Sequence, residues 1–155
     1  MYNAITRQVE LELFPCLKQY NIAFYAYNPL AGGILTGRYT REEKPSEGRF
    51  NVASMWGQKY RERYWKAEVF DVVDELAAVC KQHNISMAAA ALRWCVHHSK
   101  MDATRGDKII IGASSIDQCR ANIAACKAGP LPEDFLPIFA RGWAKHQAIS
   151  PCYFR

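Results

Sequence analysis

The segment with the clearest chemical signature is a predicted strand, turn and helix between residues 109 and 123, with the sequence IIIGASSIDQCRANI. The strand ends at Gly112, which we expect to allow a tight backbone turn. Ser114 supplies a hydroxyl, and the four residues from Ser115 to Gln118 fit a capping box that begins a helix. A helix start presents free N–H groups and a partial positive charge, which suit a phosphate. We therefore predict an anion site here, although Ser115 serving only as a cap remains the simpler alternative.

A second glycine-bearing segment, NPLAGGILTGR at residues 28–38, also follows a predicted strand. Gly32 and Gly33 would let a ligand approach the backbone closely, and Arg38 could pair with a phosphate. The alternative is a plain surface loop. Because the carboxyl ends of parallel strands meet at one face of a barrel or open sheet, the two segments should converge there. That convergence favours a nucleotide ligand.

The elements that would position these turns alternate between helix and strand. Apolar periodicity and capping signals predict helices over residues 6–19, 68–83, 87–98, 115–127 and 132–146, with a weaker helical pattern over 54–65. Continuous apolar runs at 22–27 and 108–111 predict buried parallel strands, and residues 1–3 are a further candidate strand end. Pro15 is expected to disturb the first helix near its end.

Two parallel strands cannot form a self-sufficient sheet, because each leaves unpaired backbone groups on its outer edge. The alternation of strands with helices predicts an α/β fold with a parallel sheet. The sequence therefore predicts part of a larger α/β structure.

Composition excludes several classes of function. The net charge is +5, but the cations are dispersed, and Arg61 and Arg63 are interrupted by Glu62, so we expect no nucleic-acid partner. Six cysteines without CxxC spacing indicate reduced thiols, and adjacent His97 and His98 cannot share one metal on a helix, so we expect no metal site. No apolar run of about eighteen residues and no secretory signal are present, which predicts a cytoplasmic protein without a membrane partner.

Several stretches together resemble the aldo-keto reductases, and within them the aflatoxin B1 aldehyde and succinic semialdehyde reductase subfamily. They are YNAITRQVE, FYAYNPLAGGILTGRY, YRERYW, ALRW, IIIGASSIDQCRANI and the terminal YFR, so the resemblance covers essentially the whole chain. It implies the C-terminal part of a TIM-type (β/α)8 barrel, with about strands 6–8, their helices and the C-terminal tail. Residues 1–155 would then form one partial aldo-keto reductase domain.

The resemblance implies NADPH as the cofactor. It assigns cofactor binding to Asn28, Pro29, Leu30, Ala31, Gly32, Gly33, Ile34, Leu35, Thr36, Gly37, Arg38, Arg49, Ser114, Ser115, Gln118 and Asn122. Many relatives carry a lysine beside the adenosine 2′-phosphate, whereas Gly112 and Ala113 stand at that place here. The phosphate would therefore rely on serine hydroxyls, backbone amides and an arginine.

For the substrate, the resemblance implies a small-molecule aldehyde bound by Tyr60, Arg63 and Arg155. Arginine suits an aldehyde that also carries a carboxylate, because its planar fork donates to two oxygens. The alternative for Tyr60 and Arg63 is an exposed amphipathic helix.

In the family, hydride transfer is assisted by a tyrosine, a lysine, an aspartate and a histidine that lie upstream of the part matched here. No residue of this chain is therefore assigned a catalytic role, and we expect the chain to be inactive alone. A different interpretation is a non-catalytic binding module that self-associates into a homo-oligomer through its open sheet edges.

Overall fold

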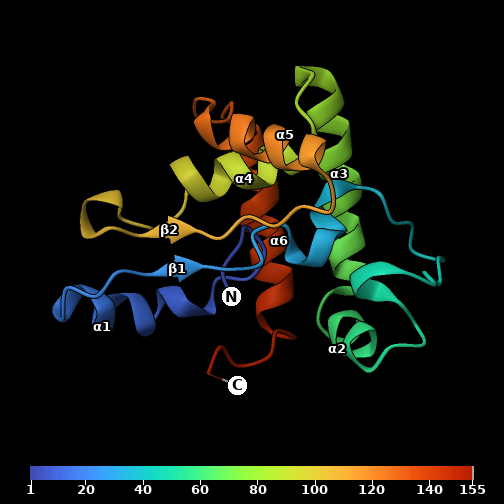
Figure 1. The fold of residues 1–155 in the computed structure, drawn as a ribbon, viewed down its shortest axis with the longest axis horizontal. Coiled ribbons are helices and arrows are strands. Elements are labelled where there is room, and N and C mark those ends of the chain that lie inside the picture. The colour runs from blue at the N-terminus through green and yellow to red at the C-terminus, as the bar shows by residue number, and fades with distance from the viewer. Residues whose placement is uncertain (155) are drawn as a thin grey trace.

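Two short parallel strands form the only sheet among residues 1–154, which are the residues that the computed structural model describes. Strand β1 (Tyr25–Ala26) pairs with β2 (Lys108–Ile109), with Tyr25 opposite Lys108, and the two strands lie side by side in Figure 1. Backbone bonds extend the ladder on both sides, from Lys108 N to Phe24 O and from Ile110 N to Ala26 O. Both predicted strands and their parallel direction are confirmed, although each is shorter than the apolar run that predicts it.

The amino ends of the two strands are joined by a buried ion pair. Asp107 accepts hydrogen bonds from the backbone N–H of Phe24 at 2.8 Å and of Asp102 at 2.7 Å, and Arg105 donates to both of its carboxylate oxygens. Burial alone would raise the pKa of Asp107, but these donors lower it below its usual value. Asp107 thereby fixes the register in which the carboxyl ends of β1 and β2 emerge together.

Residues 1–3 lie beside the carboxyl end of β1 but do not form a regular strand. Tyr2 N donates to Tyr27 O at 3.1 Å, and Asn3 forms an isolated antiparallel bridge with Thr6. The Tyr2 ring is fully buried and packs edge-on against Phe14. The structure therefore has a hydrogen-bonded turn here, where the sequence predicted a third strand end.

The α-helices account for somewhat less than half of residues 1–154. They are α1 (Leu13–Gln19), α2 (Met55–Tyr64), α3 (Ala67–His83), α4 (Met87–His97), α5 (Ile116–Lys127) and α6 (Phe135–Gln147). Serine hydroxyls cap three of them, with Ser54 accepting from Gly57 N, Ser86 from Ala89 N and Ser115 from Gln118 N. The capping signals therefore place the starts of α4 and α5 correctly, whereas α2, expected only from a weak helical pattern, proves to be capped by Ser54.

The first predicted helix, over residues 6–19, is wrong at its start. A 3-10 turn (Gln8–Glu10) comes first, and α1 begins only at Leu13. Pro15 is therefore the third residue of α1, not a disturbance near its end. Proline is tolerated in a first turn because the N–H it lacks would have no partner inside the helix there.

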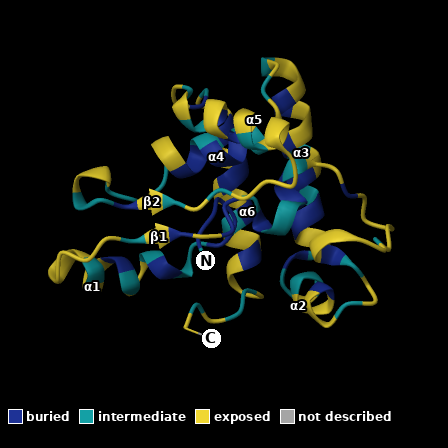
Figure 2. Cartoon of the chain, in the orientation of Figure 1, coloured by how far each residue is buried: buried dark blue, intermediate teal, exposed yellow. Residues whose placement is uncertain are grey.

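The helices cover one side of the sheet and leave the other open. Helix α3 packs against α6 and α4 against α5, and a β-carbon on Gly142 of α6 would come within 2.9 Å of Val72 on α3. Ala26 is fully buried, whereas Tyr25, Tyr27 and Ile110 are about half exposed or more. Figure 2 shows buried residues concentrated where the helices meet, with exposed residues along the strands. The sheet therefore presents aromatic and aliphatic side chains to solvent on one face.

Candidate functional site

The two glycine-bearing turns meet through two side chains from the segment between them. One terminal nitrogen of Arg49 lies 3.9 Å from the place of a β-carbon on Gly112, after β2. The other donates a hydrogen bond to the hydroxyl of Tyr60 at 3.0 Å. The Tyr60 ring lies 2.8 Å from the place of a β-carbon on Gly32, after β1. Arg49 and Tyr60 therefore lie between the two turns, which come together as the parallel strands lead us to expect.

The turn after β1 has an unusual backbone. Asn28, Ala31, Gly32 and Gly33 all have positive φ angles, of 65°, 50°, 74° and 104°. Ala31 to Thr36 form two short 3-10 segments that kink at the glycines. Only glycine fits at position 32, because a side chain there would be strained by its φ and would collide with Tyr60. This conformation brings bare backbone to the surface of the turn.

Arg38, at the end of this segment, packs against the Tyr39 ring and lies close to the backbone of Gly48. Its guanidinium lies 4.5 Å from the centre of the Tyr39 ring and donates to the Tyr39 hydroxyl. It also lies 3.2 Å from the place of a β-carbon on Gly48, in the 3-10 helix η3 (Gly48–Phe50) that carries Arg49. Arg38 therefore lies beside the short helix that contains Arg49.

The turn after β2 is held by side chains of α5. The N–H and hydroxyl of Ser114 both donate to the side-chain oxygen of Gln118, at 3.0 and 2.8 Å. The Ser115 hydroxyl accepts from Gln118 N, and the buried Asn122 donates to the carbonyl of Gly112 at 3.1 Å. The expected capping box is therefore modified, because the Gln118 side chain binds Ser114 in place of the Ser115 N–H.

The expectation for Gly112 itself is wrong. Gly112 is not among the residues with positive φ, so its turn does not need the conformational freedom of glycine. A β-carbon at position 112 would lie 3.9 Å from Arg49, which is an ordinary van der Waals distance. Neither the backbone geometry nor the approach of Arg49 therefore requires glycine at this position.

The predicted substrate residues lie on α2. The guanidinium groups of Arg49 and Arg63 lie 5.6 and 5.9 Å from the centre of the Tyr60 ring. Tyr60 and Arg63 are both partly buried, so α2 is not simply an exposed amphipathic helix. Burial and the charge of Arg63 lower the pKa of the Met1 amino group to about 6. The third predicted residue, Arg155, lies outside the described residues.

The positive charge of the site is not neutralised by local carboxylates. None of the ion pairs found among residues 1–154 involves Arg38, Arg49 or Arg63. The Arg63 Nε is buried and has no hydrogen-bond partner in that part of the chain. An anion is the ligand that this set of guanidinium groups can accept.

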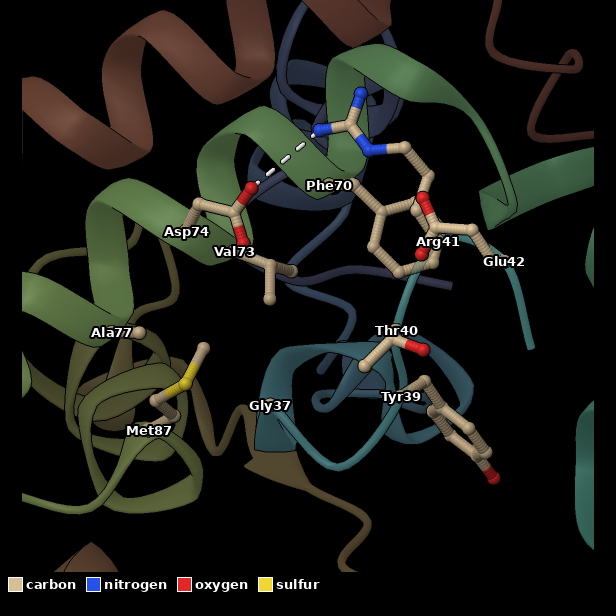
Figure 3. A pocket seen from close by; sticks show the side chains of 10 residues that line it. All are labelled: Gly37, Tyr39, Thr40, Arg41, Glu42, Phe70, Val73, Asp74, Ala77 and Met87. Carbon is tan, nitrogen blue, oxygen red and sulfur yellow. Dashed lines mark ion pairs between the residues drawn. The ribbon is translucent and has the colours of Figure 1, made fainter.

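Two surface cavities of residues 1–154 lie away from Gly32, Arg49 and Ser114, although Gly37 lines one of them. A cavity of about 320 Å3 lies between residues 37–42, α3 and the start of α4, with the ion pair of Arg41 and Asp74 at its rim (Figure 3). A second, of about 400 Å3, lies between α1 and the loop before β2. Neither is lined by Gly32, Arg49 or Ser114. Neither of these two cavities therefore reaches the surface around Gly32, Arg49 and Ser114.

Metal-ion clusters and membrane-spanning helices are both absent among residues 1–154. No cluster of three or more His, Cys, Asp or Glu side chains is placed to hold a metal ion there. None of the helices in this part of the chain combines the length and hydrophobicity of a membrane crossing. Burial raises the pKa of Cys80 to about 11 and of Cys95 to about 12.

Comparison with known proteins decides the family. The model of the aldo/keto reductase family matches residues 1–141. The chain belongs to the aldo/keto reductase family. It is 45% identical to aflatoxin B1 aldehyde reductase member 2 of Rattus norvegicus, over 100% of this chain and 44% of the relative. It is also 45% identical to aldo-keto reductase family 7 member A3 of Homo sapiens, over 100% of this chain and 49% of the relative.

The aldo/keto reductase fold is also recognisable in three dimensions. The glycerol dehydrogenase AKR11B4 of Gluconobacter oxydans matches 97% of this chain and 42% of its own, with a TM-score of 0.68 and 18% sequence identity. The chain spans about half the length of the curated relatives it matches. Its two-stranded parallel sheet with surrounding helices is consistent with part of the family's barrel.

Sequence reasoning missed Asn3 and Tyr64, two buried residues that support this aldo/keto reductase turn, although it did assign Asn28 to cofactor binding. Asn3 and Asn28 donate to the hydroxyl of Tyr64, at 3.3 and 3.0 Å. The dipeptide Tyr-Asn occurs at residues 2–3, 20–21 and 27–28, so it gives no specific signal for these residues.

Proposed function

We propose that this chain forms the NADPH- and substrate-binding part of an aldehyde reductase that reduces aldehydes of the aflatoxin dialdehyde and succinic semialdehyde type to alcohols. The observation that carries the proposal is the position of Arg49, which lies beside Gly112 after β2 and donates to Tyr60, whose ring lies beside Gly32 after β1. Relatives named as aflatoxin B1 aldehyde reductases are 44 to 45% identical over the full chain, which supports the substrate class.

The residues present fit a dinucleotide phosphate. Gly32 and Gly112 leave room for close approach to the backbone, and Arg38 and Arg49 supply charge without carboxylate partners among residues 1–154. Residues 28–38, Arg49 and the start of α5 with Ser114, Ser115, Gln118 and Asn122 would hold NADPH, which supplies a hydride when bound. The 2′-phosphate would be recognised by Arg49 and the serine hydroxyls.

For the substrate, Tyr60 and Arg63 would bind a carboxylate or a second oxygen of the aldehyde, together with Arg155. Arg63 suits this role because its partly buried guanidinium retains an unused donor. We assign no catalytic residue to this chain, so its own residues bind and orient the reactants. Residues 1–155 are thus proposed as one partial domain, covering about strands 6–8 of the barrel and its tail, in a cytoplasmic protein that is inactive alone.

Titration calorimetry of the purified chain with NADPH and NADH tests the cofactor assignment. We expect saturable binding that is tighter for NADPH, because the 2′-phosphate adds a charged contact. Absence of binding at millimolar NADPH would contradict the proposal. Reduction of succinic semialdehyde by the 155-residue chain would contradict its expected inactivity.

A second candidate function is self-association through the open face of the sheet. It is favoured by the exposure of Tyr25, Tyr27 and Ile110, which are 59%, 49% and 51% exposed. Sedimentation of the chain over a range of concentrations tests it. A dimer that dissociates on Ile110→Lys would support it, whereas a monomer at all concentrations would rule it out.

A further inference from the structure

Tyr64, the last residue of α2, joins three segments from inside the molecule. Its side chain is fully buried, and its hydroxyl accepts hydrogen bonds from Asn28 Nδ2 at 3.0 Å and Asn3 Nδ2 at 3.3 Å. The hydroxyl donates to Met1 Sδ at 3.2 Å, while Thr6 Oγ1 lies 3.5 Å away. These contacts, which we call the Tyr64 network, link α2 to the carboxyl end of β1 and to the N-terminal segment.

Asn28 connects the Tyr64 network to the turn after β1. Its side-chain oxygen accepts a hydrogen bond from Gly32 N at 2.7 Å, while its nitrogen donates to Tyr64. Its backbone carbonyl accepts from Ala31 N and from Asn3 Nδ2, both at 3.0 Å. Each end of the Asn28 amide is therefore fixed, one by the turn and the other by Tyr64.

The turn needs such support because its backbone is strained. Asn28 and Ala31 adopt left-handed φ angles of 65° and 50°, a region that is unfavourable for alanine and that asparagine tolerates better. Such conformations persist only where the surrounding structure determines them. The Tyr64 ring is itself held by stacking on the buried His146, with the ring planes 18° apart.

We propose that Tyr64 is a positioning residue, whose hydroxyl holds the Asn28 side chain so that the Gly32 turn is preformed for a ligand. The effect of this role on NADPH binding rests on the proposed function, whereas its effect on the turn does not. Tyr64 acts through Asn28, because it reaches Gly32 only by way of the Asn28 amide.

Tyr64→Phe tests this role, because it removes the hydroxyl and keeps the ring against His146. Amide hydrogen exchange of Gly32, followed by NMR, should become about tenfold faster, the factor expected for one lost buried hydrogen bond. The dissociation constant of NADPH should rise by a similar factor. Unchanged exchange of Gly32 would overturn the proposal, whether or not the chain binds NADPH. If the wild-type chain binds no NADPH, only the proposed function fails.

Tyr2→Phe is the matched control. The Tyr2 hydroxyl is equally buried and donates to Glu10 at 2.7 Å, but it makes no hydrogen bond to the turn. This variant should lose comparable thermal stability while Gly32 exchange and NADPH affinity stay at wild-type values. Equal changes in both variants would indicate general destabilisation and would overturn the proposal.

Asn28→Gly provides a second route that does not depend on the folding of Tyr64→Phe. Glycine accepts the positive φ of position 28 and removes the amide that links Tyr64 to Gly32. Gly32 exchange should accelerate about tenfold in Asn28→Gly, and adding Tyr64→Phe should produce no further acceleration. Additive effects of the two substitutions would overturn action through Asn28.

Discussion

Arg49 and Gly112 lie 63 residues apart in the sequence, yet a guanidinium nitrogen of Arg49 lies 3.9 Å from the place of a β-carbon on Gly112. This proximity places an arginine from the long segment after β1 beside the turn after β2. The same guanidinium donates to Tyr60, whose ring lies beside Gly32. A single side chain thus lies between the two halves of the proposed cofactor site.

Replacement of Arg49 should weaken NADPH binding selectively. Arg49→Ala removes a charge-assisted contact of about 1.5–3 kcal/mol, so the dissociation constant of NADPH should rise at least about tenfold. Binding of NADH should change less if Arg49 contacts the 2′-phosphate. Calorimetry at two salt concentrations measures both effects.

Arg120→Ala is the control for Arg49, because Arg120 is exposed on α5 and pairs only loosely with Asp117, at 3.8 Å. Its affinity for NADPH should remain that of the wild type. Equal losses in both variants would indicate a general effect of net charge, and no loss in Arg49→Ala would remove Arg49 from the site.

A comparison of two capping serines should distinguish a serine that also binds phosphate from one that only caps a helix. Ser115 caps α5 at the proposed site, and Ser86 caps α4 through an equivalent bond at 3.2 Å. Ser115→Ala and Ser86→Ala should each lower the free energy of unfolding by about 1 kcal/mol. Only Ser115→Ala should also weaken NADPH binding. Unchanged affinity in Ser115→Ala would leave capping as the sole role of Ser115.

The Gly32 turn should not tolerate a side chain. In Gly32→Ala the new methyl group would meet the Tyr60 ring at 2.8 Å with φ at 74°, so we expect a loss of about 2 kcal/mol or more in unfolding free energy. Gly129→Ala is the control, since no heavy atom lies within 4 Å of its β-carbon position. Urea denaturation should separate the two variants, and equal stability would contradict the packing of Tyr60 on the turn.

His146 should make the fold sensitive to acid. Burial lowers its pKa to about 4 from the ordinary 6.5, while Glu68 opposes the shift. The unfolded chain therefore binds this proton more tightly, so stability is complete above about pH 6.5 and falls as the pH drops toward 4, by up to roughly 3 kcal/mol.

His146→Leu tests this acid sensitivity by urea denaturation at pH 7.5 and 4.5. The variant should lose less stability on acidification than the wild type, because no buried imidazole remains to be protonated. His97→Gln, on the exposed side of α4, should keep the wild-type pH dependence. A His146→Leu variant with unchanged acid sensitivity would show that other groups cause it.

Local signals in the sequence were sufficient for most elements. The pattern of Ser86 before an alanine-rich run fixed the start of α4, and Asn84, with its left-handed φ of 53°, ended α3 as expected. These features depend on hydrogen bonds between residues a few positions apart. The start of α1 was predicted wrongly because the sequence did not show whether Pro15 stands near the beginning or near the end of the helix. The 3-10 turn that precedes Leu13 decides that Pro15 lies in the first turn.

The sequence by itself determined the family, the parallel pairing of β1 with β2 and the two glycine turns, because these depend on local patterns and short-range backbone chemistry. Only the tertiary structure decided that Arg49 lies beside Gly112 and that Tyr64 holds the Asn28 side chain. Such contacts join residues 36 to 63 positions apart. Their geometry is set by how α2 and η3 pack against the strand ends, and no pattern within one segment encodes that packing.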